Sequence, residues 1–376
     1  MMKTYFQKTI IYTTLVLVMG ALAPIAFAVP MWSRRYSVPC SVCHAAPSLQ
    51  LTSVGLDFFR KGHRFEKDTF DKDLSHLLSA HVETEFAAKK GTPSQFKQPD
   101  FHLHAGGAVS DHFSIYVDPN VNNDYESAYG QGTWAAGKES FVTTRVGKLT
   151  PTIIRNYAGG LMASASRPLI ISDTTLGSNP FTPGRGSYGV TVATGWKSLF
   201  VEAGVVNGDD VPGQATVNRH KDTYVSAEYA LPDGISGLGA YYHRGGYDLE
   251  DPVASTFDRY ARAALFANFT RDKFRVAGAW LTGKDSTSIQ PRPKTSGYYV
   301  QADIHPVTGI VPFVRYEYAK TDINDEGDRQ RKSTLGCSFT LFETDVSGGR
   351  IVAEAARNNR GGEHSNSGLI NLLLAF

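Results

Sequence analysis

The stretch Tyr298-Tyr299-Val300-Gln301-Ala302-Asp303-Ile304-His305 alternates between apolar side chains at its even-numbered positions and more polar ones between them. Successive side chains of a β-strand point to opposite faces, so this alternation predicts a strand with one apolar and one polar face. Tyr224–Leu231 alternates in a similar way. Strands of membrane β-barrels have this character, because their apolar side chains face lipid and their polar side chains face the lumen.

Sixteen segments of this kind, separated by turn signals, follow one another from Leu78 to the end of the chain. They cover residues 78–90, 100–110, 112–118, 129–137, 139–149, 184–197, 199–208, 222–231, 236–247, 256–270, 273–284, 295–305, 309–320, 332–342, 347–358 and 367–376. Their connections alternate between short ones, such as Arg271–Lys273, and long ones, such as Asp209–Lys221. Bacterial barrels have an even number of antiparallel strands, with short periplasmic turns and long outer loops. We therefore predict an all-β fold in which residues 78–376 form an antiparallel outer-membrane β-barrel of about 16 strands.

Composition and the end of the chain agree with this prediction. The 376 residues include 36 Gly, 18 Tyr and 21 Phe but only 41% hydrophobic residues, which suits many strands with tight turns and interfacial aromatic rings. Leu369–Phe376 alternates and ends on an aromatic residue, which resembles the assembly signal of bacterial outer-membrane proteins. Residues 150–183 form the one connection too long for an ordinary loop. Their apolar runs predict that this connection folds inward or packs on the N-terminal segment.

Residues 1–28 have the features of a secretory signal peptide. Lys3 and Lys8 precede an apolar run, and Ala26-Phe27-Ala28 provides a small-x-small cleavage pattern. An uncleaved membrane anchor is the alternative, and both imply export. Without this segment the chain has 36 basic and 36 acidic residues, so its neutrality gives no electrostatic argument for nucleic acid as a partner. No later segment reaches the roughly 18 uninterrupted apolar residues of a transmembrane helix.

Cys40-Ser41-Val42-Cys43-His44 is the CxxCH pattern of c-type haem attachment. Two thiols at this spacing can add to the two vinyl groups of one haem, and the adjacent imidazole then lies under the iron. We therefore predict one covalent haem c on Cys40 and Cys43, with His44 as the proximal iron ligand. A structural disulfide or thiol pair is the alternative. The third cysteine, Cys337, lies in a strand-like run and is predicted to be a small packing residue.

Several residues are candidates for the ligand on the other side of the iron. No methionine occurs between Met31 and Met162, and His63 is the nearest histidine downstream of the motif. We take His63 as the predicted sixth ligand, with Met31 or an open, water-bound site as alternatives. The choice matters because the axial ligand can move the redox potential by as much as ~0.8 V.

Residues 29–77 form the predicted monohaem cytochrome c segment. These roughly 50 residues are too few to bury a haem within a hydrophobic core of their own. The segment therefore needs another surface to cover it, and the barrel lumen would provide one. We predict that the haem segment plugs the lumen.

The residues around CxxCH resemble those of a known family. An aromatic and basic run, Pro30–Tyr36, precedes the motif, and a Pro…Leu…Gly…Phe…Gly series follows it at Pro47, Leu51, Gly55, Phe58, Phe59 and Gly62. This arrangement resembles the fused outer-membrane monohaem cytochrome c–porin family, the iron-oxidising outer-membrane cytochromes. The likeness covers Pro30–Gly62 in sequence and the remainder of the chain in architecture.

The resemblance implies a role in electron transport and iron oxidation. An extracellular Fe(II) ion, or another extracellular donor, would give one electron to the haem, which would pass it to a periplasmic cytochrome or other carrier. This describes an Fe(II)-oxidising oxidoreductase embedded in the outer-membrane lipid of a Gram-negative bacterium. Two alternatives are an outward electron conduit to an external acceptor and a diffusion porin with a haem-bearing plug.

Strand parity brings further polar residues to the lumen. His81, Glu83 and Glu85 share the polar side of the first predicted strand, and His102 and His104 share that of the second. Because these strands are neighbours, the five side chains could lie together, and mixed imidazole and carboxylate ligands would suit iron. The simpler interpretation is that they are ordinary polar residues of a porin-like interior.

Overall fold

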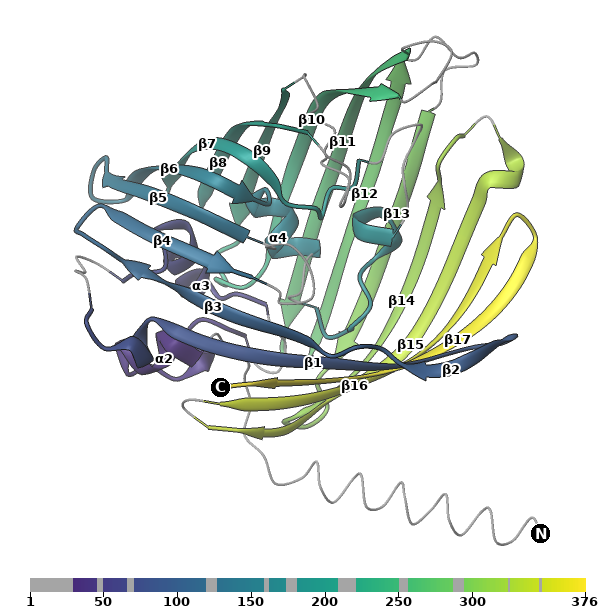
Figure 1. The fold of residues 1–376 in the computed structure, drawn as a ribbon, viewed down its shortest axis with the longest axis horizontal. Coiled ribbons are helices and arrows are strands. Elements are labelled where there is room, and N and C mark those ends of the chain that lie inside the picture. The colour runs from purple at the N-terminus through teal and green to yellow at the C-terminus, as the bar shows by residue number, and fades with distance from the viewer. Residues whose placement is uncertain are drawn as a thin grey trace, which may run out of the picture.

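The computed structural model describes residues 30–45, 50–65, 71–119, 127–158, 162–173, 181–208, 221–249, 256–286, 294–323, 325–344 and 347–376. The predicted signal peptide, residues 1–28, lies outside them. None of the helices in these ranges is both long and apolar enough to cross a membrane. Strands make up most of the described chain and join into one closed sheet (Figure 1).

The strands run antiparallel to their neighbours around the whole sheet. They are β1 (Leu78–Lys89), β2 (Thr92–Phe96), β3 (Asp100–Ala108), β4 (Phe113–Asp118), β5 (Ser127–Ala135), β6 (Ser140–Leu149), β7 (Ser187–Trp196), β8 (Leu199–Val206), β9 (Asp222–Ala230), β10 (Gly237–Leu249), β11 (Thr256–Arg271), β12 (Phe274–Ser286), β13 (Lys294–Ile304), β14 (Ile310–Lys320), β15 (Arg329–Glu343), β16 (Gly348–Arg360) and β17 (Glu363–Ala375). The sheet closes where β1 pairs with β17, His81 opposite Ala375.

Two of these strands, β2 and β3, occupy one position around the barrel. Both pair with β1: Phe86 lies opposite Phe96 of β2, and His81 lies opposite His102 of β3. They are therefore one interrupted strand, and the barrel has 16 strand positions in the described chain. The predicted all-β, 16-stranded antiparallel barrel is confirmed.

The two faces of the wall differ as the alternation predicts. On β13, Val300 is 48% exposed on the outside, whereas Tyr299 and Gln301 are at most 1% exposed on the inside. The same alternation of buried and exposed residues runs along β7, β8, β9 and β12. The outer face therefore carries an apolar belt that suits lipid, and the inner face carries polar groups.

Val300→Arg tests this orientation. The guanidinium would lie in hydrocarbon near the middle of β13, so we expect a loss of about 2–4 kcal/mol in the free energy of unfolding. Denaturant unfolding of the barrel in lipid vesicles, followed by tryptophan fluorescence, measures the loss. Val307→Arg is the matched control, because Val307 is exposed in the turn after β13 and outside the strands. Equal losses for both variants would contradict the placement of the wall in the bilayer.

Two connections that the sequence predicts to be long are tight turns. β1 and β2 are joined at Gly91, and β16 and β17 at Gly361 and Gly362, all three with positive φ. Glycine adopts such conformations without a steric penalty, and paired left-handed residues match the twist of a hairpin. The strands continue past their predicted ends, so the strict alternation of short and long connections is wrong at these two places.

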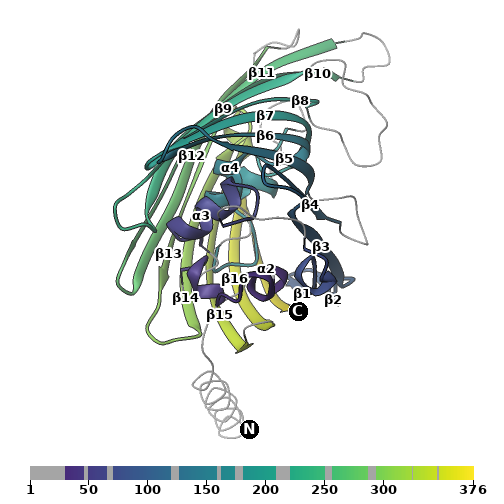
Figure 2. The same ribbon diagram turned by 90° about the vertical axis from the view of Figure 1, so that its left-hand side faces the viewer.

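The N-terminal segment lies inside one end of the barrel (Figure 2). It contains α2 (Pro30–Tyr36), a 3₁₀ turn at Cys40–Val42, α3 (Ser53–Arg60) and a 3₁₀ turn at Leu74–His76. Arg64 donates to the main-chain carbonyls of the β3–β4 turn, and the Ser53 amide donates to the Gly234 carbonyl in the β9–β10 turn. Both turns belong to the end with the short connections, so this segment, from here on the plug, closes that mouth.

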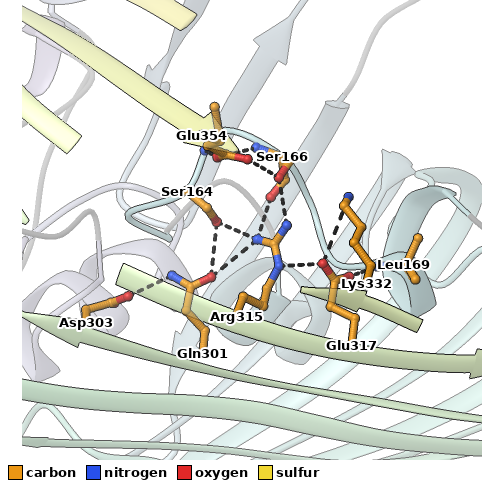
Figure 3. A network of polar contacts seen from close by, with 10 residues as sticks. Ser164, Ser166, Leu169, Gln301, Asp303, Arg315, Glu317, Lys332 and Glu354 are labelled. Carbon is orange, nitrogen blue, oxygen red and sulfur yellow. Dashed lines mark hydrogen bonds and ion pairs between the residues drawn. The ribbon is translucent and has the colours of Figure 1, made fainter. Parts of the chain in front are cut away.

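The long connection between β6 and β7 folds inward, as predicted. Its helix α4 (Thr152–Ala158) lies within the ring of strands, and Tyr157 accepts a hydrogen bond of 2.7 Å from Tyr299 on the opposite wall. Further along, Ser164 and Ser166 bond to Arg315 of β14 (Figure 3). The Glu317 carboxylate pairs with Arg315 at 2.8 Å and accepts the Leu169 amide at 2.6 Å. These buried polar contacts fix the connection, here called the inner loop, to the wall.

Candidate functional site

The Cys40–His44 turn is a compact unit that presents two thiols and an imidazole together. The Cys40 carbonyl accepts from the amides of Cys43 and His44, at 3.1 and 2.9 Å, so the motif follows one helical turn. Thr52 ties this turn to α3: its hydroxyl donates to the Val42 carbonyl at 2.7 Å, and its amide donates to the Cys43 carbonyl at 2.9 Å. The spacing of the motif therefore becomes a fixed local geometry.

Gly55 explains how α3 comes so close to this turn. A Cβ atom at Gly55 would lie 2.1 Å from the Cys43 carbonyl oxygen, a distance at which the backbones would have to separate. The Thr52 hydroxyl also accepts the Gly55 amide as the N-cap of α3. Glycine is the only residue that allows the helix to support the Cys40–His44 turn at this distance.

Both plug cysteines are free thiols in this structure. Burial raises the pKa of both Cys40 and Cys43 to about 11, so they are protonated at neutral pH. Reactive cysteines have lowered pKa values and electropositive surroundings, so these thiols do not resemble a catalytic thiolate pair. Two neutral thiols beside one imidazole fit the chemistry of thioether attachment to haem.

His63 lies in the plug behind the end of α3. Its φ of 58° follows the left-handed Gly62, and this reversal turns the imidazole into the buried face of the plug. The ring stacks on Trp32 at 4.2 Å with an interplanar angle of 12°, and no residue that the structure describes bonds to its buried Nδ1. Burial and the nearby Arg155 and Arg145 lower the pKa of His63 well below its usual value. A neutral imidazole with an unpaired nitrogen is the form that ligates a metal.

Met31, the alternative axial ligand, has a packing role. It is fully buried in an apolar cluster that includes Tyr116, Ile153 and Leu149. Hydrophobic contacts thus account for the burial of Met31. The buried Nδ1 of His63, in contrast, has no hydrogen-bond partner in the described chain. His63 therefore stays the predicted sixth ligand, and its unpaired nitrogen is the observation that fits the prediction.

The three predicted lumen histidines do come together. His81 Nδ1 lies 2.8 Å from His104 Nε2, and His81 stacks on His102 at 4.2 Å. Asp118, which the sequence analysis did not select, lies 3.0 Å from His102 Nδ1 and 3.4 Å from His104 Nδ1. Strand parity is the signal that could have identified Asp118, since it shares the inward face of β4 with Tyr116.

The two predicted carboxylates do not join this cluster. Glu83 accepts from Asn371 of β17 at 2.5 Å, and Glu85 pairs with Lys97. The stacked rings of His81 and His102 lie in nearly parallel planes, so their nitrogens do not converge on one point. Among the described residues no group of three or more His, Cys, Asp or Glu is arranged to hold a metal ion. The three histidines and Asp118 therefore form a hydrogen-bonded polar cluster without Glu83 and Glu85. Iron binding by the five predicted residues stays a prediction.

Comparison with known proteins defines the fold but not a family. No protein-family model matches the chain, and no curated protein matches it. Solved structures match closely in shape. OmpT of Vibrio cholerae, expressed in the outer membrane, has a TM-score of 0.58 at 10% identity, over 83% of this chain and 100% of that one.

Two further structures have the same fold. An anion-selective porin from Comamonas acidovorans has a TM-score of 0.58 at 14% identity, over 80% of this chain and 98% of that one. OmpF of Salmonella typhi in complex with daunomycin has a TM-score of 0.56 at 11% identity, over 80% and 97%. The closed barrel and its apolar belt place this chain in the outer membrane of a Gram-negative bacterium, with its short turns and the plug at the periplasmic mouth.

Proposed function

We propose that this chain is a plugged outer-membrane barrel that moves single electrons between the cell exterior and the periplasm. Cys40 and Cys43 would hold one haem c through thioether bonds, and His44 and His63 would ligate its iron. A bound haem supplies reversible one-electron chemistry. Extracellular Fe(II) is the proposed donor and becomes Fe(III), and a periplasmic cytochrome or other carrier gains the electron.

The observation that supports this proposal most is the position of the Cys40–His44 turn. It lies in the plug at the periplasmic mouth, supported by Thr52 and Gly55 and not by a core of its own. A redox group held there would be within reach of a periplasmic carrier and separated from lipid by the barrel wall. The resemblance of Pro30–Gly62 to the iron-oxidising cytochrome–porins supports Fe(II) as the donor.

A diffusion porin with a haem-bearing plug is the second candidate function, and the similarity to an anion-selective porin favours it. Against free diffusion, inward side chains described on β13 and β14 are buried where the inner loop lies on the wall, including Gln301, Arg315 and Glu317. This candidate therefore requires the inner loop and the plug to move. An outward conduit would use the same residues with the electron flowing the other way.

Anaerobic addition of Fe(II) to the purified protein in detergent tests the proposed donor. We expect the absorption bands of reduced c-type haem to grow with each addition of Fe(II), and the titration to bracket the potential. A haem that dithionite reduces but Fe(II) does not would contradict iron oxidation and favour the outward conduit. A chain without any covalent haem would contradict both electron-transfer readings and leave the porin.

His63→Ala tests the axial assignment. We expect the haem to remain covalently attached while the ferric form changes from low spin to high spin, because the sixth ligand is lost. Optical and electron paramagnetic resonance spectra measure this change without any turnover. Met31→Leu is the matched control and should stay low spin. The assignment of His63 would be wrong if only the Met31 variant changed its spin state.

A further inference from the structure

One buried ion pair joins the plug to the barrel wall. Arg60, the last residue of α3, places Nη2 2.9 Å from Oε2 of Glu228 on β9, and the two side chains are only 6% and 0% exposed. The Arg60 guanidinium also lies over the ring of Phe200 at 4.4 Å. A charged pair in such surroundings holds its partners together because each charge is left uncompensated if the other leaves.

The Glu228 carboxylate also receives the inner loop. Asn156 of α4 donates to the same oxygen, Oε2, at 3.4 Å. The plug, the inner loop and the wall therefore meet at a single side chain. Movement of the plug would remove the only strong donor that this oxygen has within the described chain, since its second donor is a long, neutral contact.

Polar atoms around the pair are incompletely satisfied. Within the described ranges, four buried atoms have no hydrogen-bond partner: Arg60 Nε, Glu228 Oε1, Asn156 Oδ1 and Ser226 Oγ. Water entering the junction would satisfy these atoms, so hydration lowers the cost of separating plug and wall. The junction thus combines one buried charge pair and a hydrogen bond of 2.7 Å from Gln131 of β5 to the Arg60 carbonyl with polar atoms that water can reach and satisfy when the pair separates.

We propose that the Arg60–Glu228 pair is the latch of a gated diffusion pathway: while it is closed the plug blocks the lumen, and when it opens small solutes pass. This deepens the porin candidate among the proposed functions by naming what regulates it. It does not depend on the haem, so its failure and the failure of the electron-transfer proposal are distinguishable.

Conductance of the full chain in planar lipid bilayers tests the latch. Wild-type channels should be closed for most of the recording. Arg60→Met and Glu228→Gln each leave one buried charge without its partner, so the ratio of open to closed time should rise by roughly a hundredfold or more. The double variant Arg60→Met/Glu228→Gln has no buried charge to expel and should return toward the wild-type ratio.

Lys61→Met is the matched control, because Lys61 follows Arg60 as the C-cap of α3. Its ion pair with Asp57 is exposed, and the one described contact of its side chain with the wall is with the Phe141 ring at 5.2 Å. Lys61→Met should conduct like the wild type. Arg60→Lys keeps the charge with a shorter reach and should open less than Arg60→Met, which provides a milder variant if the others fold poorly. Single variants that stay closed, or a double variant as open as the singles, would overturn the latch. Reduction of the haem by Fe(II) should be unchanged in any outcome of the conductance test.

Discussion

Replacing both Cys40 and Cys43 by Ser is expected to remove the covalent haem completely, together with the absorption bands of the reduced protein. The two thiols lie on one turn whose geometry is set by Thr52 and Gly55, so they are the groups that thioether attachment would use. Haem staining on denaturing gels and the dithionite-reduced spectrum measure the loss. The barrel itself should still fold, because its wall does not depend on this turn.

Cys337→Ser is the control for the cysteine variants. Cys337 lies on β15 as a free, partly buried thiol, in the strand that its sequence predicted. Its replacement should leave haem content and spectrum unchanged. Single replacements of Cys40 or Cys43 should retain one attachment point and give reduced haem content. Haem that stays covalently bound in the double Ser variant would contradict the assigned attachment site.

Arg315→Met is expected to release the inner loop from the wall and to lower the free energy of unfolding by about 3–5 kcal/mol, the usual loss when one partner of a buried ion pair is removed. Arg315 pairs with Glu317 at 2.8 Å and donates to the Ser166 carbonyl at 2.8 Å and to the Ser164 hydroxyl at 2.7 Å (Figure 3). The substitution therefore leaves a carboxylate and two inner-loop groups without their main donor.

Denaturant unfolding and limited trypsin digestion measure this effect. Cleavage after Arg155, in the inner loop, should become faster in the Arg315 variant. Arg244→Met is the matched control, because Arg244 is exposed on the outward face of β10. A variant of Arg315 as stable and as protease-resistant as the Arg244 control would contradict the role assigned to this network.

The barrel wall was predictable from the sequence because its signal is local. The alternation of lipid-facing and lumen-facing residues has a period of two, so β13 could be placed to within one residue of its observed bounds. Thr92–Phe96 was missed because β2 is exposed along its length and contains Pro93, so it has no apolar face to alternate with a polar one. The tight turn at Gly361 and Gly362 was missed for a related reason: the polar ends of β16 and β17 resemble a loop.

The candidate site was predictable only where one short motif carries it. Cys40, Cys43 and His44 are neighbours in the chain, so their spacing alone predicts haem attachment, and the structure places them on one turn. Arg60 and Glu228 are far apart in sequence and meet only because the plug enters the barrel. The period of two placed the side chains of His81 and His102 on the inward face of two neighbouring strands. It could not predict that their rings stack instead of converging on an ion.

Electron transfer across a sealed membrane tests the central claim most directly. The protein is reconstituted into liposomes that enclose oxidised cytochrome c, and Fe(II) is added outside under anaerobic conditions. We predict that the enclosed cytochrome is reduced in liposomes with the wild-type chain and not in those with the Cys40→Ser/Cys43→Ser variant, whose barrel gives the same leak. Reduction at equal rates in both would contradict an electron path through a haem on the plug.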